Sequence, residues 1–213
     1  MRKFWLTIAT TFVAAGLFAQ NNMTVATEKA NLAKESLDSG DYLTAAAGFK
    51  DALSLAEQSG DEGTALASVC RDIIPKALNA AARKSLSIND FDTAVSSLQG
   101  VVDFAGLYGD SSTASRAKDL IPQVLVKKAG ALLDSKKYEE AAEVCRTALE
   151  ADPSNGAASL RLGMALESLG NYWSAVDAYK NAAANGQEKN AASRLGQCYL
   201  LRALDELKAK DFT

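Results

Sequence analysis

The sequence predicts an all-α protein in which helix hairpins repeat along most of the chain. Composition supports this class: the 213 residues are rich in alanine, only 7% are aromatic and only 3 are proline. This balance favours helices with small residues at their contacts. A short polar turn followed by an aromatic residue recurs, and small and large apolar residues follow each aromatic at helical spacing. A chain of this length can bury the core of one domain or of a short repeat array.

The first residues are typical of a secretory signal peptide. Arg2 and Lys3 give a positive start, the stretch 4–19 is mostly apolar, and Gln20 follows the small Ala19. An uncleaved membrane anchor is the alternative interpretation. The apolar run is about 16 residues long, however, and a membrane-spanning helix needs about 20.

We therefore expect signal peptide 1–19, a short linker at 20–25, and export of the mature protein to the periplasm or the outer envelope. No stable membrane span should remain after cleavage. Loss of the two basic residues lowers the net charge from −3 to −5. Because an acidic chain has no overall attraction for nucleic acid or for an anionic membrane surface, we expect neither as a partner.

The repeated element is a polar turn that leads into a helix. It occurs at Gly40-Asp41-Tyr42, Asn89-Asp90-Phe91, Lys136-Lys137-Tyr138 and Gly170-Asn171-Tyr172. Alanine follows three residues after each aromatic, at Ala45, Ala94, Ala141 and Ala175. A larger apolar residue comes four positions later, at Phe49, Leu98, Cys145 and Tyr179, and a further apolar residue three positions after that, at Ala52, Val101, Ala148 and Ala182. These spacings place all twelve residues on the inner faces of helices.

A second apolar stripe precedes these turns, so the unit is a helix, a tight turn and another helix. Leu162, Gly163 and Leu166 precede the turn at Gly170, and Val124 and Leu125 precede the turn at Lys136. Short turns force antiparallel packing of the two helices. Small residues such as Gly163 allow the helix axes to approach closely.

These motifs resemble the tetratricopeptide repeat family, whose pattern joins Leu-Gly-x-x-Tyr to Ala-x-x-x-Phe and ends near a proline. The matching segments are Leu195-Gly196-Gln197-Cys198-Tyr199, Leu162-Gly163, Ala45-x-x-x-Phe49, Ala175-x-x-x-Tyr179 and Pro153. The resemblance covers about residues 26–213. It implies a right-handed α-solenoid of antiparallel helix hairpins, in which the first helices line an inner groove that holds extended peptides. A heptad-based bundle is the rival fold, but no 3.5-residue period continues through the turns.

The predicted units are about 26–60, 75–109, 122–155, 156–188 and a partial unit 189–213. The aromatic anchors are separated by 49, 47 and then 34 residues, and only the last step has the family's usual length. The first two units therefore carry a matched insertion near Gly60-Asp61 and Gly109-Asp110. Pro75 and Pro122 would either begin helices or kink longer ones.

The last predicted unit is expected to stop inside a hairpin. Asp211-Phe212 resembles the turns that begin second helices, and only Thr213 follows. We expect Leu195, Tyr199 and Leu204 to lack a covering helix. Either the sequence is truncated or this end docks on something.

Several classes of chemistry are excluded or disfavoured. The chain contains no histidine, which excludes His-dependent triads and His-ligated metals. Phosphate-binding glycine loops are missing from the sequence as well, so we expect no enzyme, no cofactor and no metal site. Cys70, Cys145 and Cys198 are too far apart to suggest a zinc site. We expect buried apolar packing for Cys145 and Cys198, with an intermolecular disulfide as the alternative.

The resemblance instead implies a protein-interaction module or scaffold of the cell envelope, which binds a protein or peptide partner. The repeat register places a largely basic set of residues on the first helices: Lys34, Lys76, Asn79, Arg83, Lys127, Arg161 and Arg194. Such a row favours an acidic or carboxylate-ended peptide, although an ordinary solvated face has the same composition. The alternative function is a structural component that self-associates through its C-terminal end.

Overall fold

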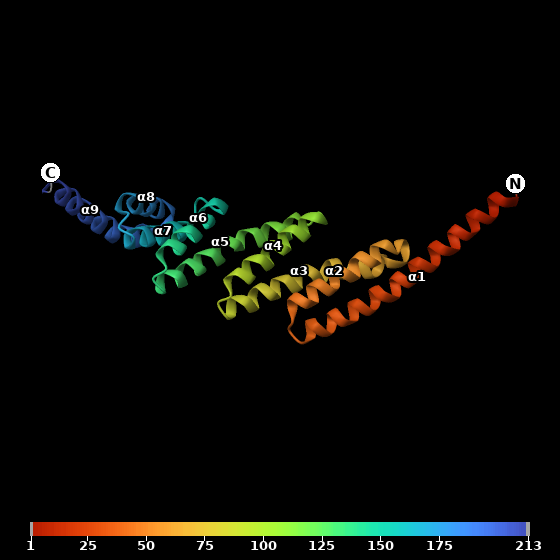
Figure 1. The fold of residues 1–213 in the computed structure, drawn as a ribbon. Coiled ribbons are helices and arrows are strands. Elements are labelled where there is room, and N and C mark those ends of the chain that lie inside the picture. The colour runs from red at the N-terminus through yellow and green to blue at the C-terminus, as the bar shows by residue number, and fades with distance from the viewer. Residues whose placement is uncertain (1, 212–213) are drawn as a thin grey trace. The chain divides into compact units, whose positions relative to one another are not determined.

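The computed structural model describes the backbone of residues 2–211 and the side chains of residues 20–208. Helices and turns account for this part of the chain, and it contains no strand. Figure 1 shows the nine α-helices in chain order. Their bounds are α1 Arg2–Asp38, α2 Tyr42–Gln58, α3 Thr64–Ser87, α4 Phe91–Leu107, α5 Ser111–Asp134, α6 Tyr138–Ala151, α7 Gly156–Ser168, α8 Tyr172–Ala182 and α9 Glu188–Asp211. The predicted all-α class of helix hairpins is confirmed.

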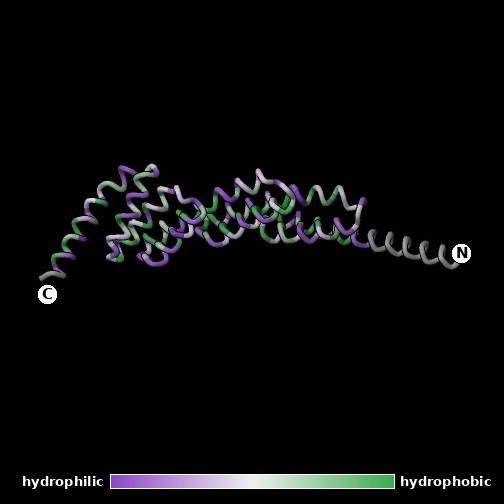
Figure 2. Tube along the Cα trace, turned by 90° about the horizontal axis from the view of Figure 1, so that it is seen from above, coloured by the Kyte–Doolittle hydropathy of each residue, from purple (hydrophilic) through white to green (hydrophobic). Residues whose placement is uncertain are grey.

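The chain forms two compact units. Unit 1 contains residues up to 85 and 96–115, and unit 2 contains residues 86–95 and those from 116 onward. Within each unit, apolar positions alternate with polar ones along the helices, as the hydropathy colouring in Figure 2 shows. This alternation is the pattern expected of helices that bury one face.

The predicted inner positions of the second helices are confirmed. All twelve residues listed for α2, α4, α6 and α8 in the repeat register are at most 3% exposed. Small side chains on these helices allow close contacts within each hairpin. In unit 1, a Cβ atom added to Gly48 of α2 would lie 2.9 Å from the Cβ atom of Ala33 on α1. Ala33 is itself buried, so a larger residue at position 48 would separate the two helices.

The hairpin turns share one backbone geometry. Gly40, Asn89, Lys136 and Gly170 all have a positive φ, between 59° and 79°. At Gly170 the next residue, Asn171, donates its backbone N–H to the carbonyl oxygen of Leu166 at 2.9 Å. This bond satisfies a carbonyl that the end of α7 would otherwise leave unpaired, and it reverses the chain at once.

Aspartate side chains accept hydrogen bonds from the first turns of two of the second helices. Asp41 accepts a hydrogen bond from the backbone N–H of Thr44 at 3.3 Å, and Asp90 accepts one from Thr93 at 3.1 Å. These are N-caps, which explains why an aspartate precedes the aromatic residue in the first two turns.

The matched insertions lengthen the first helices, and in the first unit a short 3-10 helix, Gly60–Gly63, also precedes α3. α3 and α5 each have 24 residues, whereas α7 has 13. Pro75 and Pro122 both occupy the twelfth position of their helices. The unit boundaries expected at 75 and 122 therefore differ from the structure, because the helices begin at Thr64 and Ser111. A proline can lie inside a helix when packing offsets the lost backbone bond.

The N-terminal part differs from expectation in one respect. Residues 20–25, predicted to be a linker, continue α1 without a break. Ala26, Ala30 and Ala33 on this helix are buried. Within the described part of the chain, no helix combines length and apolarity to the extent that a membrane crossing requires.

All three cysteines are buried and free. Cys145 and Cys198 have no exposed surface and contribute to the packing, as predicted. Burial raises the pKa of the Cys145 thiol to about 12, although the positive charges of Arg161 and Arg146 oppose the shift. A thiol of this kind stays protonated at neutral pH and reacts slowly with oxidants.

Candidate protein-interaction surface

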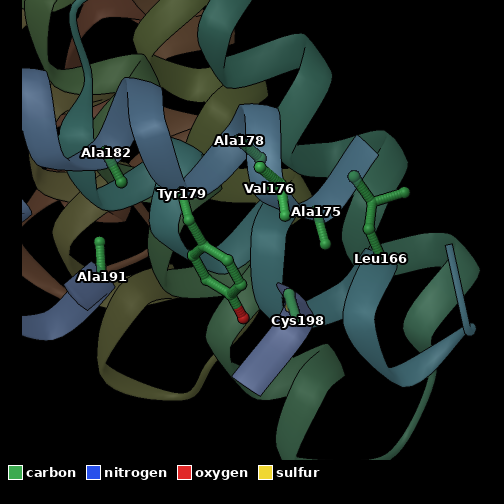
Figure 3. Packing of buried hydrophobic residues seen from close by; sticks show 8 residues of the cluster. All are labelled: Leu166, Ala175, Val176, Ala178, Tyr179, Ala182, Ala191 and Cys198. Carbon is green, nitrogen blue, oxygen red and sulfur yellow. The ribbon is translucent and has the colours of Figure 1, made fainter. Parts of the chain in front are cut away.

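α7 and α9, two of the first helices of unit 2, pack on a core centred on Tyr179 of α8. This residue of α8 is completely buried, and Figure 3 shows its ring beside Cys198, with Ala175 and Ala182 on the same helix. A Cβ atom added to Gly163 of α7 would lie only 2.5 Å from the tyrosine ring. The ring therefore fills the space that glycine leaves open on α7.

The hydroxyl end of Tyr179 joins a polar network at the edge of this core. The Tyr179 hydroxyl donates to Oε2 of Glu167 on α7 at 2.5 Å. The same carboxylate oxygen lies 3.1 Å from Nη1 of Arg194 on α9. Burial, with the hydrogen bond to Glu167 as a second cause, raises the pKa of Tyr179 well above its usual range. The phenol remains a neutral donor, and the network ties α7, α8 and α9 together.

Arg194 therefore has a structural partner. Sequence reasoning placed it among the residues that bind a peptide, but its guanidinium is engaged by Glu167, whose side chain is only 11% exposed. Removing Arg194 would leave this carboxylate poorly compensated. This pairing could not be predicted from the sequence, because the two residues are 27 positions apart.

Arg161 of α7 lies against the preceding first helix. Its Nε atom is 3.2 Å from the position that a Cβ atom would take at Gly130 of α5. Glycine at position 130 thus leaves room for the guanidinium beside α5. Lys127 is one turn earlier on the same helix and is exposed. No ion pair joins either Arg161 or Lys127 to an acidic residue in the part of unit 2 that the structure describes.

The predicted basic residues of unit 1 have mixed surroundings. Lys34 pairs with Asp38 at 2.7 Å and Lys76 with Asp72 at 2.6 Å, each on its own helix. The side chain of Asn79 donates to the carbonyl oxygen of Pro75 at 2.9 Å. Arg83 is exposed, and no ion pair involves it among the described residues. Lys34 and Lys76 are therefore partly neutralised by exposed pairs that contribute little to stability.

Sequence reasoning missed a second polar cluster, in unit 1. Arg71 of α3 lies 2.7 Å from Glu57 of α2, and the hydroxyl of Tyr108 donates to the same carboxylate at 3.0 Å. The guanidinium of Arg71 also lies 4.8 Å from the centre of the Tyr108 ring. The hydrogen bond from Arg71 is the main cause that lowers the pKa of Glu57.

This cluster borders a surface cavity of about 450 Å³ between α2 and α4 of unit 1. Leu53 and Phe104 form part of its apolar lining, and Lys50 and Asp103 are at its edge. Glu57 and Tyr108 shortly precede the two Gly-Asp bends, which is the only sequence signal that marks them. The apolar part of this lining can accept an apolar side chain.

No group of His, Cys, Asp and Glu residues able to hold a metal ion is found in the described part of the chain. The carboxylates of the two networks, Glu57 and Glu167, are each held by an arginine and a tyrosine. The hydrogen bond from Arg71 favours the ionised form of Glu57, and each of the two carboxylates cross-links neighbouring helices. The two networks therefore hold neighbouring helices together.

Residues 132–193 match the model of a tetratricopeptide repeat family. The match includes α6, α7 and α8, together with the adjoining ends of α5 and α9, and it supports the resemblance seen in the sequence motifs. No curated protein matches the chain at a significant level.

Solved structures resembling the chain include tetratricopeptide domains and a MamA structure, all distant in sequence. The domain of OM64 from Arabidopsis is 20% identical with a TM-score of 0.38, over 58% of this chain and 94% of that chain. The C-terminal domain of an FK506-binding protein from Plasmodium falciparum is 17% identical with a TM-score of 0.44, over 65% and 91%. A variant of MamA is 18% identical with a TM-score of 0.41, over 89% of each chain.

Proposed function

We propose that this protein is a non-enzymatic scaffold of the cell envelope that holds a protein or peptide partner on the first helices of unit 2. Tetratricopeptide repeats are in general interaction modules without catalytic activity, and residues 132–193 match such a family. The observation that carries the proposal is the pair Lys127 and Arg161, two cations on successive first helices that no described acidic side chain neutralises.

The chemistry of this pair favours an acidic or carboxylate-ended peptide. A guanidinium presents two parallel N–H donors to a carboxylate, and the guanidinium of Arg161 lies close to Gly130 of α5. Lys127 is exposed and can adjust to a second carboxylate one turn away. Arg194 is engaged by Glu167 and has a smaller part in direct binding.

A binding experiment tests this choice of residues. A fluorescent peptide rich in Asp and Glu is titrated against the wild type and a Lys127→Ala/Arg161→Ala variant, with a peptide of Asn and Gln as reference. We expect the double substitution to weaken binding of the acidic peptide by at least about tenfold, since charge-assisted hydrogen bonds contribute about 1.5–3 kcal/mol each. Raising the salt concentration should weaken wild-type binding, because exposed charges are screened over about 8 Å.

A matched variant removes the same charge from the other helices of unit 2. Arg146 of α6 and Lys180 of α8 are exposed residues on second helices. The Arg146→Ala/Lys180→Ala variant should bind the acidic peptide like the wild type. If both double variants lose affinity equally, the effect is one of net charge, and the partner binds elsewhere.

Export is the second part of the proposal. The basic start and apolar stretch of residues 1–19 support cleavage after Ala19. Expressed in a bacterium with its own leader, the protein should appear in the envelope fraction, and its N-terminal residue should be Gln20. Arg2→Glu/Lys3→Glu should leave more uncleaved protein inside the cell. Recovery of the intact chain from the cytosol would contradict export.

The alternative function is a structural component that assembles with copies of itself. One observation favours it, namely an exposed apolar face on α9 that includes Leu200 and Leu207, 61% and 59% exposed.

A further inference from the structure

α9 has two apolar faces, and unit 2 covers only one of them. Ala191 and Cys198 are completely buried against α8, and Leu195 packs on the same cluster. The opposite face carries Tyr199, Leu200, Leu204 and Leu207, which are 43% to 61% exposed. A helix that is apolar on both sides is normally buried on both sides.

The exposed residues form one continuous stripe. With 3.6 residues per turn, Gly196, Tyr199, Leu200, Leu204 and Leu207 fall within an arc of about 140°. The exposed Ala192 and Ala203 lie in the same arc. Ala192, Gly196, Tyr199 and Ala203 are spaced by four, three and four residues, which is the spacing of a helix-pairing seam.

A glycine on α7 shows which side chain can pack against a helix face of this kind. Gly163 and Gly196 occupy the same place in successive Leu-Gly motifs, on α7 and α9. On α7 the glycine receives the ring of Tyr179. On α9 a Cβ atom added to Gly196 would meet nothing within 4 Å. Gly196 is thus an empty position of the type that an aromatic ring fills one hairpin earlier.

We propose that a second copy of this chain covers the face, through an antiparallel pairing of α9 with α9 about a two-fold axis. In this register Tyr199 of one subunit packs on Gly196 of the other, and the reverse contact forms at the same time. Ala192 similarly lies opposite Ala203. The face therefore carries both halves of the contact, as a closed two-fold interface requires.

Charge complementarity supports the same register. The pairing that places Tyr199 opposite Gly196 also places Lys189 opposite Glu206, twice in the dimer. Both side chains are exposed, and Glu206 also pairs with Arg202 of its own helix at 3.0 Å, so Lys189 of the other subunit would be the second cation beside this carboxylate. Exposed pairs of this kind add little energy, but like charges at these places would oppose the register. The inference rests on the alternative function, self-assembly through α9, and names the contact that this assembly would use. It uses none of the residues proposed for the partner peptide.

The mass of the full-length protein as a function of concentration tests the pairing. We expect the wild type to approach twice its monomer mass by sedimentation equilibrium at concentrations up to about 100 μM, an affinity in the range of weak specific interfaces. Gly196→Leu should raise the dissociation constant at least about tenfold, because a leucine fills the space meant for Tyr199 of the other subunit. The monomer tolerates this change, since leucine is a better helix former than glycine.

Gly106→Leu is the matched control. Gly106 is an exposed helical glycine of α4, and a Cβ atom there also meets nothing within 4 Å. This variant should dimerise like the wild type, and both variants should melt no lower than the wild type. A wild type that stays monomeric would overturn the proposal, as would a Gly196→Leu variant that dimerises normally. A monomer is also the result expected if another protein covers this face.

Cross-linking tests the register separately. Gly196→Cys and Tyr199→Cys chains, mixed and oxidised, should form disulfide-linked dimers faster than either variant alone. The native cysteines are buried and should give little background. Equal rates for the mixture and for the single variants would reject this register.

Discussion

Replacing Tyr179 by alanine is expected to lower the free energy of unfolding by about 3–5 kcal/mol, the range for deletion of a large buried ring. Tyr179 has no exposed surface, and its ring fills the space above Gly163 between α7 and α9. The substitution also removes the donor to Glu167. Urea denaturation followed by circular dichroism measures the change.

Tyr179→Phe separates the ring from the hydroxyl. It keeps the packing and removes only the hydrogen bond to Glu167, which Arg194 continues to hold. We expect a loss of about 1 kcal/mol. If the alanine variant unfolds at the same urea concentration as the wild type, α8 does not pack on α7 through this residue.

The helix register could be read from the sequence because helical spacing and burial are local properties. Phe49, Leu98, Cys145 and Tyr179 recur at the same distance from their turns, and all four are buried. The pattern alternates on a 3.6-residue period that no other regular structure shares. The turns were predictable for the same reason, since each lies between two apolar stripes.

Partners across helices could not be read in this way. Arg194 and Glu167 are far apart in sequence, and their contact depends on the distance between α7 and α9. The sequence placed Arg161 on a first helix, as observed. Its contact with Gly130 of α5 depends on how the hairpins pack and could not be predicted. The pairs Lys34–Asp38 and Lys76–Asp72, by contrast, have the i,i+4 spacing of helix-surface ion pairs and were detectable in the sequence.

How closely a motif matches the repeat pattern does not predict whether its residues are buried. Leu195-Gly196-x-x-Tyr199 matches the repeat pattern fully, yet Tyr199 is 44% exposed. Leu162-Gly163 has leucine in place of the tyrosine, and Leu166 is only 5% exposed. A motif defines which residues a helix offers, whereas burial depends on whether a neighbouring helix is present to receive them.

This difference leads to a contrast between two identical substitutions. Gly163→Ala is expected to destabilise the protein by about 2–3 kcal/mol, because the new methyl group would lie 2.5 Å from the ring of Tyr179. The ring cannot withdraw easily, since Glu167 holds its hydroxyl and Cys198 lies beside it. Gly196→Ala meets no atom within 4 Å in the monomer and should instead stabilise α9 by up to about 1 kcal/mol.

The comparison is made by urea denaturation at a low protein concentration, where the chain is monomeric. Both substitutions change glycine to alanine inside a helix and after a leucine, so helix propensity raises stability equally in the two variants. The difference between them, about 3–4 kcal/mol in favour of Gly196→Ala, therefore isolates the contact with Tyr179. Combining Gly163→Ala with Tyr179→Leu should recover part of the loss, because the smaller side chain leaves room for the methyl group. Equal stability of the two single variants would mean that the ring of Tyr179 lies away from α7. The contact of Tyr179 with Gly163, on which the proposed pairing of α9 with α9 is based, would then not exist.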